Sequence, residues 1–192
     1  MKKTVRTIIV AIVGVALIIG YYVYLTGKNN NGVENNTEEL SAVQELLTTD
    51  FEEKYPATPR EVIRVFNRFL NCFYNEELSE NDIVNLANAQ RIFLDEELLD
   101  NNPSTQYLQS MKADVQKNHE EKRTIRSASV CGSNEVIYKT VDSRKCAYVT
   151  CGYFMKVGKE FQSTTQRYVL RKDSEGKWKI LVYYLIQNGE EE

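Results

Sequence analysis

The hydrophobic pattern of this 192-residue chain changes its period near residue 123. Before that point apolar side chains recur every three or four positions, as in Val62, Phe66 and Phe69, which is the repeat of one helix face. After it they alternate with polar side chains or form β-branched and aromatic runs, which is typical of strands. Helices followed by strands predict an α+β domain, with the helices packed on one face of a curved antiparallel sheet.

The helical part predicts about three helices after a short amphipathic segment within Thr37 to Tyr55. The run Thr-Pro-Arg-Glu from Thr58 is a capping box with proline at the first helical position, so one helix starts there. Ser79 caps the second helix, which residues 91–102 finish or continue with a bend. Pro103 opens the third.

The second part predicts a cone-like sheet of four to five antiparallel strands. Each break between two runs contains Gly, Asn, Asp or Ser, which are turn residues. The expected strands are residues 125–131, 135–141, 145–157, 160–172 and 177–187.

The last strand should bury the face that carries its only tryptophan. Trp178 and Ile180 lie two positions apart, and simple alternation places Val182 and Tyr184 on the same face. We expect this face to pack against the helices.

An uncharged run of twenty residues, Thr7 to Thr26, predicts a transmembrane helix, because about 20 apolar residues span the hydrocarbon core of a bilayer. Lys2, Lys3 and Arg6 precede it, so the positive-inside rule predicts a cytoplasmic N-terminus and a domain on the outer side of the cell membrane. A cleaved signal peptide is the alternative. The run is longer than usual for one and has no A-x-A pattern.

The chain therefore divides into four predicted segments. They are a cytoplasmic tip with the transmembrane helix (residues 1–27), a stalk with a short amphipathic helix (28–57), the cone-like α+β domain (58–187) and an acidic tail (188–192).

Charge argues against nucleic acid as a partner. The segment after residue 27 holds 21 Lys and Arg against 27 Asp and Glu, a net charge of −6. Binding to a polyanion depends on Lys and Arg that neutralise its phosphates. No P-loop and no G-x-G-x-x-G occurs, so no nucleotide or other cofactor is expected.

The cysteines and the single histidine do not form a recognisable reactive site. Cys72, Cys131, Cys146 and Cys151 contain no C-x-x-C pair, and His119 lies far from them, so no metal site is expected. Cys131 could form a disulfide with Cys146 or Cys151. We expect free thiols instead. No G-x-S-x-G motif is present, so no catalytic nucleophile is predicted.

The order of three helices and a long-stranded meander resembles the nuclear-transport-factor-2-like superfamily. The last hairpin, RYVLRKDSEGKWKILVYY, is similar to the recurrent final hairpin of that superfamily. The resemblance covers roughly residues 58–187 and implies a cone-shaped α+β fold. With the predicted anchor, the layout also resembles uncharacterised membrane proteins of Gram-positive bacteria and, more loosely, assembly factors of type IV secretion.

An enzyme of this fold would need an acid–base pair inside the cone. The candidate pocket residues are Tyr74, Asp95, Tyr107, Tyr148 and Tyr184. The leading hypothesis is a membrane-anchored, non-catalytic binding or assembly module that contacts another envelope protein or a second copy of itself. The alternatives are a small-molecule enzyme of isomerase or dehydratase type and a scaffold component of a secretion or conjugation apparatus.

Overall fold

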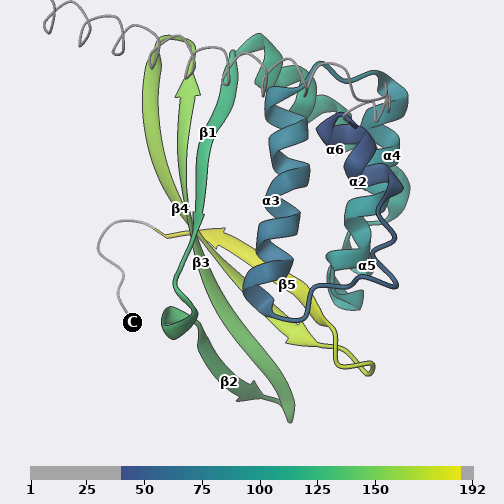
Figure 1. The fold of residues 1–192 in the computed structure, drawn as a ribbon, viewed down its shortest axis with the longest axis vertical. Helices are drawn as coiled ribbons and strands as arrows, with labels where there is room; N and C mark the ends of the chain where they lie inside the picture. Colours follow the sequence, from purple (N-terminus) through teal and green to yellow (C-terminus); the bar gives the residue numbers. More distant parts are fainter. Residues whose placement is uncertain (1–39, 187–192) are drawn as a thin grey trace, which may run out of the picture. The chain divides into compact units, whose positions relative to one another are not determined.

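The structure, a computed structural model, describes residues 40–186, and its first part is helical (Figure 1). The helices end where the hydrophobic period changes, as the sequence predicted. They are α2 (Ala42–Thr48), α3 (Pro59–Asn75), α4 (Glu80–Gln90), α5 (Glu96–Asn101) and α6 (Ser104–Glu120), with a 3-10 turn η1 (Arg91–Phe93) after α4.

Two of the predicted helix starts are confirmed. The hydroxyl of Thr58 accepts a hydrogen bond from the backbone N–H of Glu61 at 3.2 Å, and the Glu61 carboxylate accepts one from the N–H of Thr58 at 3.1 Å. Ser79 and Asp82 form the same reciprocal pair before α4. These contacts satisfy N–H groups that the first turn of a helix leaves without a partner.

The prediction of about three helices is too low, because residues 91–102 do not continue α4. Leu94 and Asp95 are extended and lie along the last strand, where the N–H of Asp95 donates to the carbonyl of Ile180 at 2.8 Å. This extended step separates η1 from α5. The helix α2 is also part of the domain, because Leu46 on it is fully buried.

The second part is a five-stranded antiparallel sheet in which β2 and β1 both pair with β3. Asp142 and Ser143 join β2 to β3 with positive φ angles of 48° and 64°, as a two-residue hairpin turn requires. The strands are β1 (Arg123–Val130), β2 (Ile137–Val141), β3 (Arg144–Val157), β4 (Glu160–Lys172) and β5 (Trp178–Leu185).

The helices gather on one face of the sheet, and the core lies between the two layers (Figure 1). Inward side chains of β3 and β4 meet the apolar stripe of α3. Phe51, which precedes α3, is buried in this core. The compact unit therefore begins at Leu40, earlier than the predicted boundary at residue 58.

The predicted fold class also needs a correction at its start. The predicted transmembrane helix, residues 7–26, lies outside the described residues. Among residues 40–186 no helix has the length and apolar character needed to cross a bilayer, since the longest two, α3 and α6, have 17 residues and carry charged side chains. The described fold is thus an α+β domain with an antiparallel sheet. That the domain lies on the outer side of the cell membrane remains a prediction.

Candidate functional site

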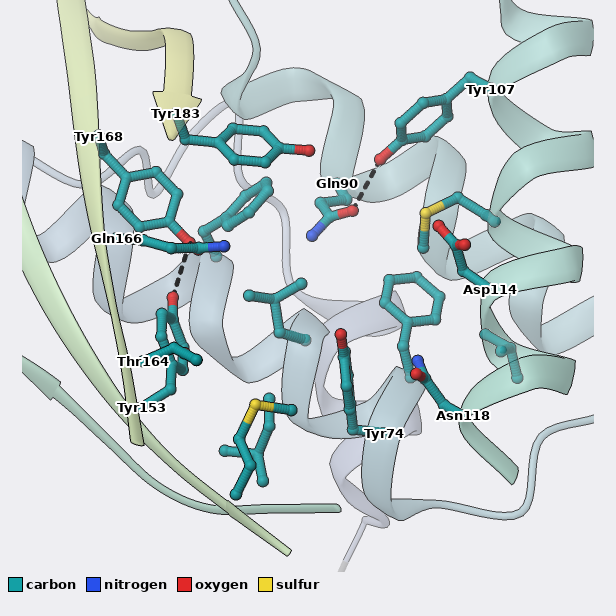
Figure 2. A pocket seen from close by; sticks show the side chains of 17 residues that line it. Tyr74, Gln90, Tyr107, Asp114, Asn118, Tyr153, Thr164, Gln166, Tyr168 and Tyr183 are labelled. Carbon is teal, nitrogen blue, oxygen red and sulfur yellow. Dashed lines mark hydrogen bonds between the residues drawn. The ribbon is translucent and has the colours of Figure 1, made fainter. Parts of the chain in front are cut away.

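A cavity of about 190 Å³ lies between the helices and the sheet (Figure 2). We call it the tyrosine pocket. Helices α3, α4 and α6 form one wall, and strands β1, β3, β4 and β5 form the other. It is lined by Phe66, Leu70, Phe73, Tyr74, Gln90, Tyr107, Met111, Asp114, Val115, Asn118, Ile125, Tyr153, Met155, Thr164, Gln166, Tyr168 and Tyr183.

The apolar part of the pocket comes mainly from α3. Phe66, Leu70 and Phe73 recur at helical spacing on the face that the helix turns toward the sheet. Met111 and Met155 complete this wall from α6 and β3. Such a surface favours an apolar molecule, because binding removes apolar area from water.

On the sheet side two buried tyrosines form a hydrogen-bonded network. The hydroxyls of Tyr153 and Tyr168 lie 2.6 Å apart. Tyr153 donates its one hydroxyl proton to Oδ1 of Asn67 at 2.6 Å. The Tyr168 hydroxyl has two acceptors in reach, the Tyr153 oxygen and Oε1 of Gln166 at 2.7 Å, and donates its one proton to either of them. The amide of Asn67 in turn contacts Sγ of Cys151 at 3.3 Å. These partners hold both rings in place in the wall of the cavity.

On the helix side Gln90 carries an unpartnered donor. Gln90 is the last residue of α4 and only 1% exposed, and its Oε1 accepts a hydrogen bond from the Tyr107 hydroxyl at 2.8 Å. Its Nε2 is buried and has no hydrogen-bond partner among the described residues. Figure 2 shows this nitrogen pointing into the cavity, as the hydroxyls of Tyr74 and Tyr183 also do. A buried amide N–H without a partner is costly, and a ligand oxygen placed beside it would remove that cost.

Burial keeps the tyrosine hydroxyls protonated. It raises the pKa of Tyr107 to about 12, and it raises the pKa of Tyr153 and of Tyr168 further above the ordinary value. All three hydroxyls are therefore neutral hydrogen-bonding groups at neutral pH rather than bases. The only carboxylate in the lining, Asp114, is exposed.

The structure brings together two of the five predicted pocket residues. Tyr74 and Tyr107 line the tyrosine pocket. Tyr148 lies on the opposite face of the sheet, where the ammonium of Lys139 sits 5.4 Å from its ring centre. Tyr184 is exposed on that same face.

A β-bulge explains why Tyr183, and not Tyr184, reaches the pocket. Trp178 and Ile180 are buried under the helices, as predicted. The pairing of β5 with β4 then skips Leu181, because Leu170 pairs with Ile180 and Val169 pairs with Val182. One extra residue reverses the alternation beyond it, so Tyr183 shares a face with its partner Tyr168. The prediction that Val182 and Tyr184 share the buried face is wrong for this reason.

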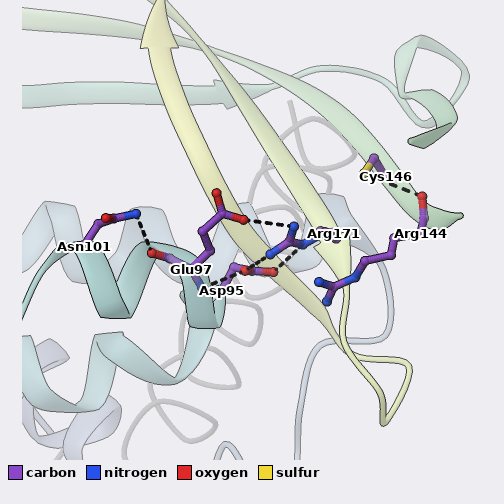
Figure 3. A network of polar contacts seen from close by, with 6 residues as sticks. All are labelled: Asp95, Glu97, Asn101, Arg144, Cys146 and Arg171. Carbon is purple, nitrogen blue, oxygen red and sulfur yellow. Dashed lines mark hydrogen bonds and ion pairs between the residues drawn. The ribbon is translucent and has the colours of Figure 1, made fainter. Parts of the chain in front are cut away.

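Asp95, the fifth predicted pocket residue, does not line the pocket and forms an ion pair with Arg171 instead (Figure 3). It is 1% exposed, caps α5 through the N–H of Glu97 at 3.1 Å, and receives a two-pronged contact from the guanidinium of Arg171. Arg171 also reaches the Glu97 carboxylate at 3.1 Å. Its hydrogen bonds to the Asp95 carboxylate raise the pKa of Arg171, so this cation stays charged and links α5 to β4.

Sequence reasoning missed most of the polar lining. The alternation of β3 offered one usable signal, because Tyr153 falls on the same face as Val149 and Cys151. No sequence signal pointed to Gln90 or Asn118 as pocket residues, because single polar residues on helices are usually exposed. Their place in the pocket depends on how α4 and α6 pack.

The cysteines are all free thiols. The N–H of Cys131 donates to the carbonyl of Thr150 at 2.9 Å, and Cys131 forms no disulfide with either candidate partner, Cys146 or Cys151. In the part of the chain that the structure describes, no group of His, Cys, Asp and Glu could hold a metal ion.

The fold and this pocket define a small α+β domain with a partly polar, ligand-sized cavity. The family model described as "Domain of unknown function (DUF6715)" matches residues 1–183, and the chain belongs to that family. No curated protein matches the chain.

Among solved structures, the chain is similar to an NMR solution structure of a protein described as the transfer protein TraH of the Gram-positive conjugative plasmid pIP501. The two share 15% identity with a TM-score of 0.36, over 71% of this chain and 99% of that one. A TM-score this low does not establish a shared fold, so nothing is carried over from that protein. The resemblance to the nuclear-transport-factor-2-like superfamily stays a prediction.

Proposed function

We propose that this domain is a non-catalytic binding module whose tyrosine pocket holds a small, mostly apolar molecule with a hydrogen-bond acceptor. The observation that carries the proposal is the amide of Gln90. Its Nε2 is buried and aimed into an otherwise largely apolar cavity, with no partner among the described residues.

The size of the cavity limits the ligand. A protein cavity of about 150 Å³ holds benzene, and the tyrosine pocket measures about 190 Å³. A substituted aromatic ring or a short branched chain, with one carbonyl, carboxyl or hydroxyl oxygen, matches this volume. The oxygen would accept from Gln90, and the apolar part would lie on Phe66 and Phe73.

The protonation of the lining favours binding over reaction. Proton transfer at neutral pH needs a group with a pKa near 7. The pKa values of Tyr107, Tyr153 and Tyr168 are raised away from that range, and the Asp114 carboxylate is exposed. These tyrosines orient a ligand better than they abstract a proton.

Ligand-observed NMR on the full chain tests this proposal. We expect saturation transfer to small phenols, aryl ketones and aryl acids, and much less to the same rings without oxygen. Gln90→Leu should weaken binding about tenfold, which corresponds to one lost hydrogen bond of about 1.4 kcal/mol. Gln109→Leu, an exposed glutamine on α6, is the matched control and should change nothing. Equal binding of ring compounds with and without oxygen, or no effect of Gln90→Leu, would show that this pocket is not the site.

A further inference from the structure

The tyrosine pocket has one charged side chain in its wall, the carboxylate of Asp114 on α6. Among the described residues, no Lys, Arg or His lines the cavity. Asp114 and Tyr183 are exposed although both line it, so they lie where the pocket opens to solvent. Within residues 40–186, none of the salt bridges includes Asp114. The opening of the pocket therefore carries a negative charge.

Asp114 lies on the side of α6 that also carries Tyr107, the hydrogen-bond partner of Gln90. It follows Tyr107 by about two helical turns, or roughly 10 Å along the helix axis. Met111, between the two, lines the pocket as well. In Figure 2 the carboxylate of Asp114 points from α6 toward the cavity, into which Nε2 of Gln90 also points. The pocket thus offers a hydrogen-bond donor at one place and a negative charge at another.

The charge of Asp114 acts across the cavity on the opposite wall. Tyr183 belongs to β5, and its hydroxyl points into the cavity (Figure 2). Desolvation of this hydroxyl is the first cause that raises the pKa of Tyr183, and the negative charge of Asp114 is the second. A field that disfavours the tyrosinate anion at this place favours a cation there.

Aromatic rings make up much of the remaining wall. Seven of the 17 lining residues are Phe or Tyr. The face of such a ring is electrostatically negative and attracts cations. The protein itself places the guanidinium of Arg91 5.0 Å from the ring centre of Tyr107. Arg91 does not line the cavity, and its Nη1 donates to the carbonyl of Asn102 at 3.1 Å, so this cation does not fill the pocket.

We infer that the tyrosine pocket selects a small organic cation, an amine or quaternary ammonium compound that also carries an oxygen. The ammonium lies beside Asp114 at the opening, and the oxygen accepts from Nε2 of Gln90. This inference rests on the function proposed above and adds the charge of the ligand to it. Because Asp114 is exposed, the ammonium keeps part of its water and avoids most of the cost of burying a charge. An anion would meet the same carboxylate and no cation of the wall.

The test uses the full chain and three phenols of similar size that differ in charge. Tyramine is a cation at pH 7, 4-propylphenol is neutral, and 3-(4-hydroxyphenyl)propanoate is an anion. We expect NMR titrations at low salt to give tyramine a Kd about fivefold below that of 4-propylphenol, since an exposed ion pair and a cation–ring contact are both weak. The propanoate should bind most weakly of the three. The advantage of tyramine should shrink at high salt, because salt screens exposed charges.

Asp114→Asn tests the source of the preference. It removes the negative charge at an exposed position, so the domain should fold, tyramine should lose about fivefold in affinity and 4-propylphenol should bind as before. Glu120→Gln is the matched control, because it makes the same kind of change at an exposed residue of α6 that does not line the pocket. It should leave all three affinities unchanged. Gln90→Leu should weaken all three phenols alike, since it acts on the shared oxygen.

The outcomes separate this inference from the proposed function. Binding of 4-propylphenol that depends on Gln90, with tyramine no tighter, would overturn the selection of cations and leave the binding function intact. So would a preference for tyramine that persists in Asp114→Asn. No binding of any of the three phenols would overturn both.

Discussion

Around Phe69 the space between the helices and the sheet is filled by packed side chains, whereas around Tyr74 the same space contains a cavity. Phe51, Phe69 and Phe93 form the closed region, with ring centres 5.2 to 6.0 Å apart in tilted and edge-to-face contacts. We call these three residues the phenylalanine cluster. The ring of Tyr55 packs on Phe93 at 5.6 Å and sends its hydroxyl out to Trp178.

The two regions differ because tyrosine carries a hydroxyl group and phenylalanine does not. Phenylalanine rings have no polar atom, so they can approach until the space between them is filled. Buried tyrosines must place each hydroxyl beside a partner, and Tyr153 and Tyr168 do so with each other, Asn67 and Gln166. These bonds fix where the two rings lie, with Tyr153 bound to α3 through Asn67, and the space beside the rings is the tyrosine pocket. Four predictions test whether one region serves stability and the other serves binding.

The largest effect is expected in the phenylalanine cluster. Phe69 is fully buried, so Phe69→Ala should lower the free energy of unfolding by about 3–5 kcal/mol through lost burial and a new cavity. Met111→Ala, at the half-buried wall of the pocket, should cost only about 1 kcal/mol. Urea denaturation followed by circular dichroism measures both, and equal losses would contradict the division into two regions.

Tyr153→Phe should have the next largest effect. It removes a buried hydroxyl and leaves Oδ1 of Asn67 without its donor, which should cost about 1–3 kcal/mol. Tyr74→Phe is the comparison, because the Tyr74 hydroxyl has no hydrogen-bond partner within residues 40–186. It should shift stability by less than about 0.5 kcal/mol. A neutral Tyr153→Phe would mean that the network does not hold the pocket open.

Alkaline pH should destabilise the domain, in part through Tyr107. Burial raises the pKa of Tyr107 from its ordinary value near 10 to about 12, so the folded state holds this proton more tightly than the unfolded state does. The stabilisation is complete below pH 10 and is lost as the pH rises through about 12. Thermal unfolding between pH 9 and 12 should show this decline, and Tyr107→Phe should make it shallower. An unchanged slope in that variant would rule out Tyr107 as a source.

The smallest effect on stability should come from Gln90→Leu. The change removes a buried amide whose Nε2 has no partner among the described residues, but it also removes the acceptor of the Tyr107 hydroxyl. The two effects oppose each other, so the free energy of unfolding should change by less than about 1 kcal/mol. The same variant should lose ligand affinity. This combination is expected of a residue whose role is ligand binding. A fall of about 2 kcal/mol or more in the free energy of unfolding would identify Gln90 as a structural residue.

Several features were readable from the sequence because they depend on neighbours in the chain. The capping boxes at Thr58 and Ser79, the helix-to-strand change near residue 123 and the burial of Trp178 are of this kind. Each is set by contacts within a few residues or by a simple period.

Tertiary structure alone decided the composition of the site. The bulge at Leu181 turns Tyr183 into the pocket and Tyr184 out of it, because register depends on how β5 pairs with β4. Asp95 looked like a candidate acid, yet the extended step after η1 brings it to Arg171, a residue 76 positions away in the chain. Gln90 lies in the cavity because α4 ends over it. Such placements depend on packing between distant segments, and no local pattern in the sequence encodes them.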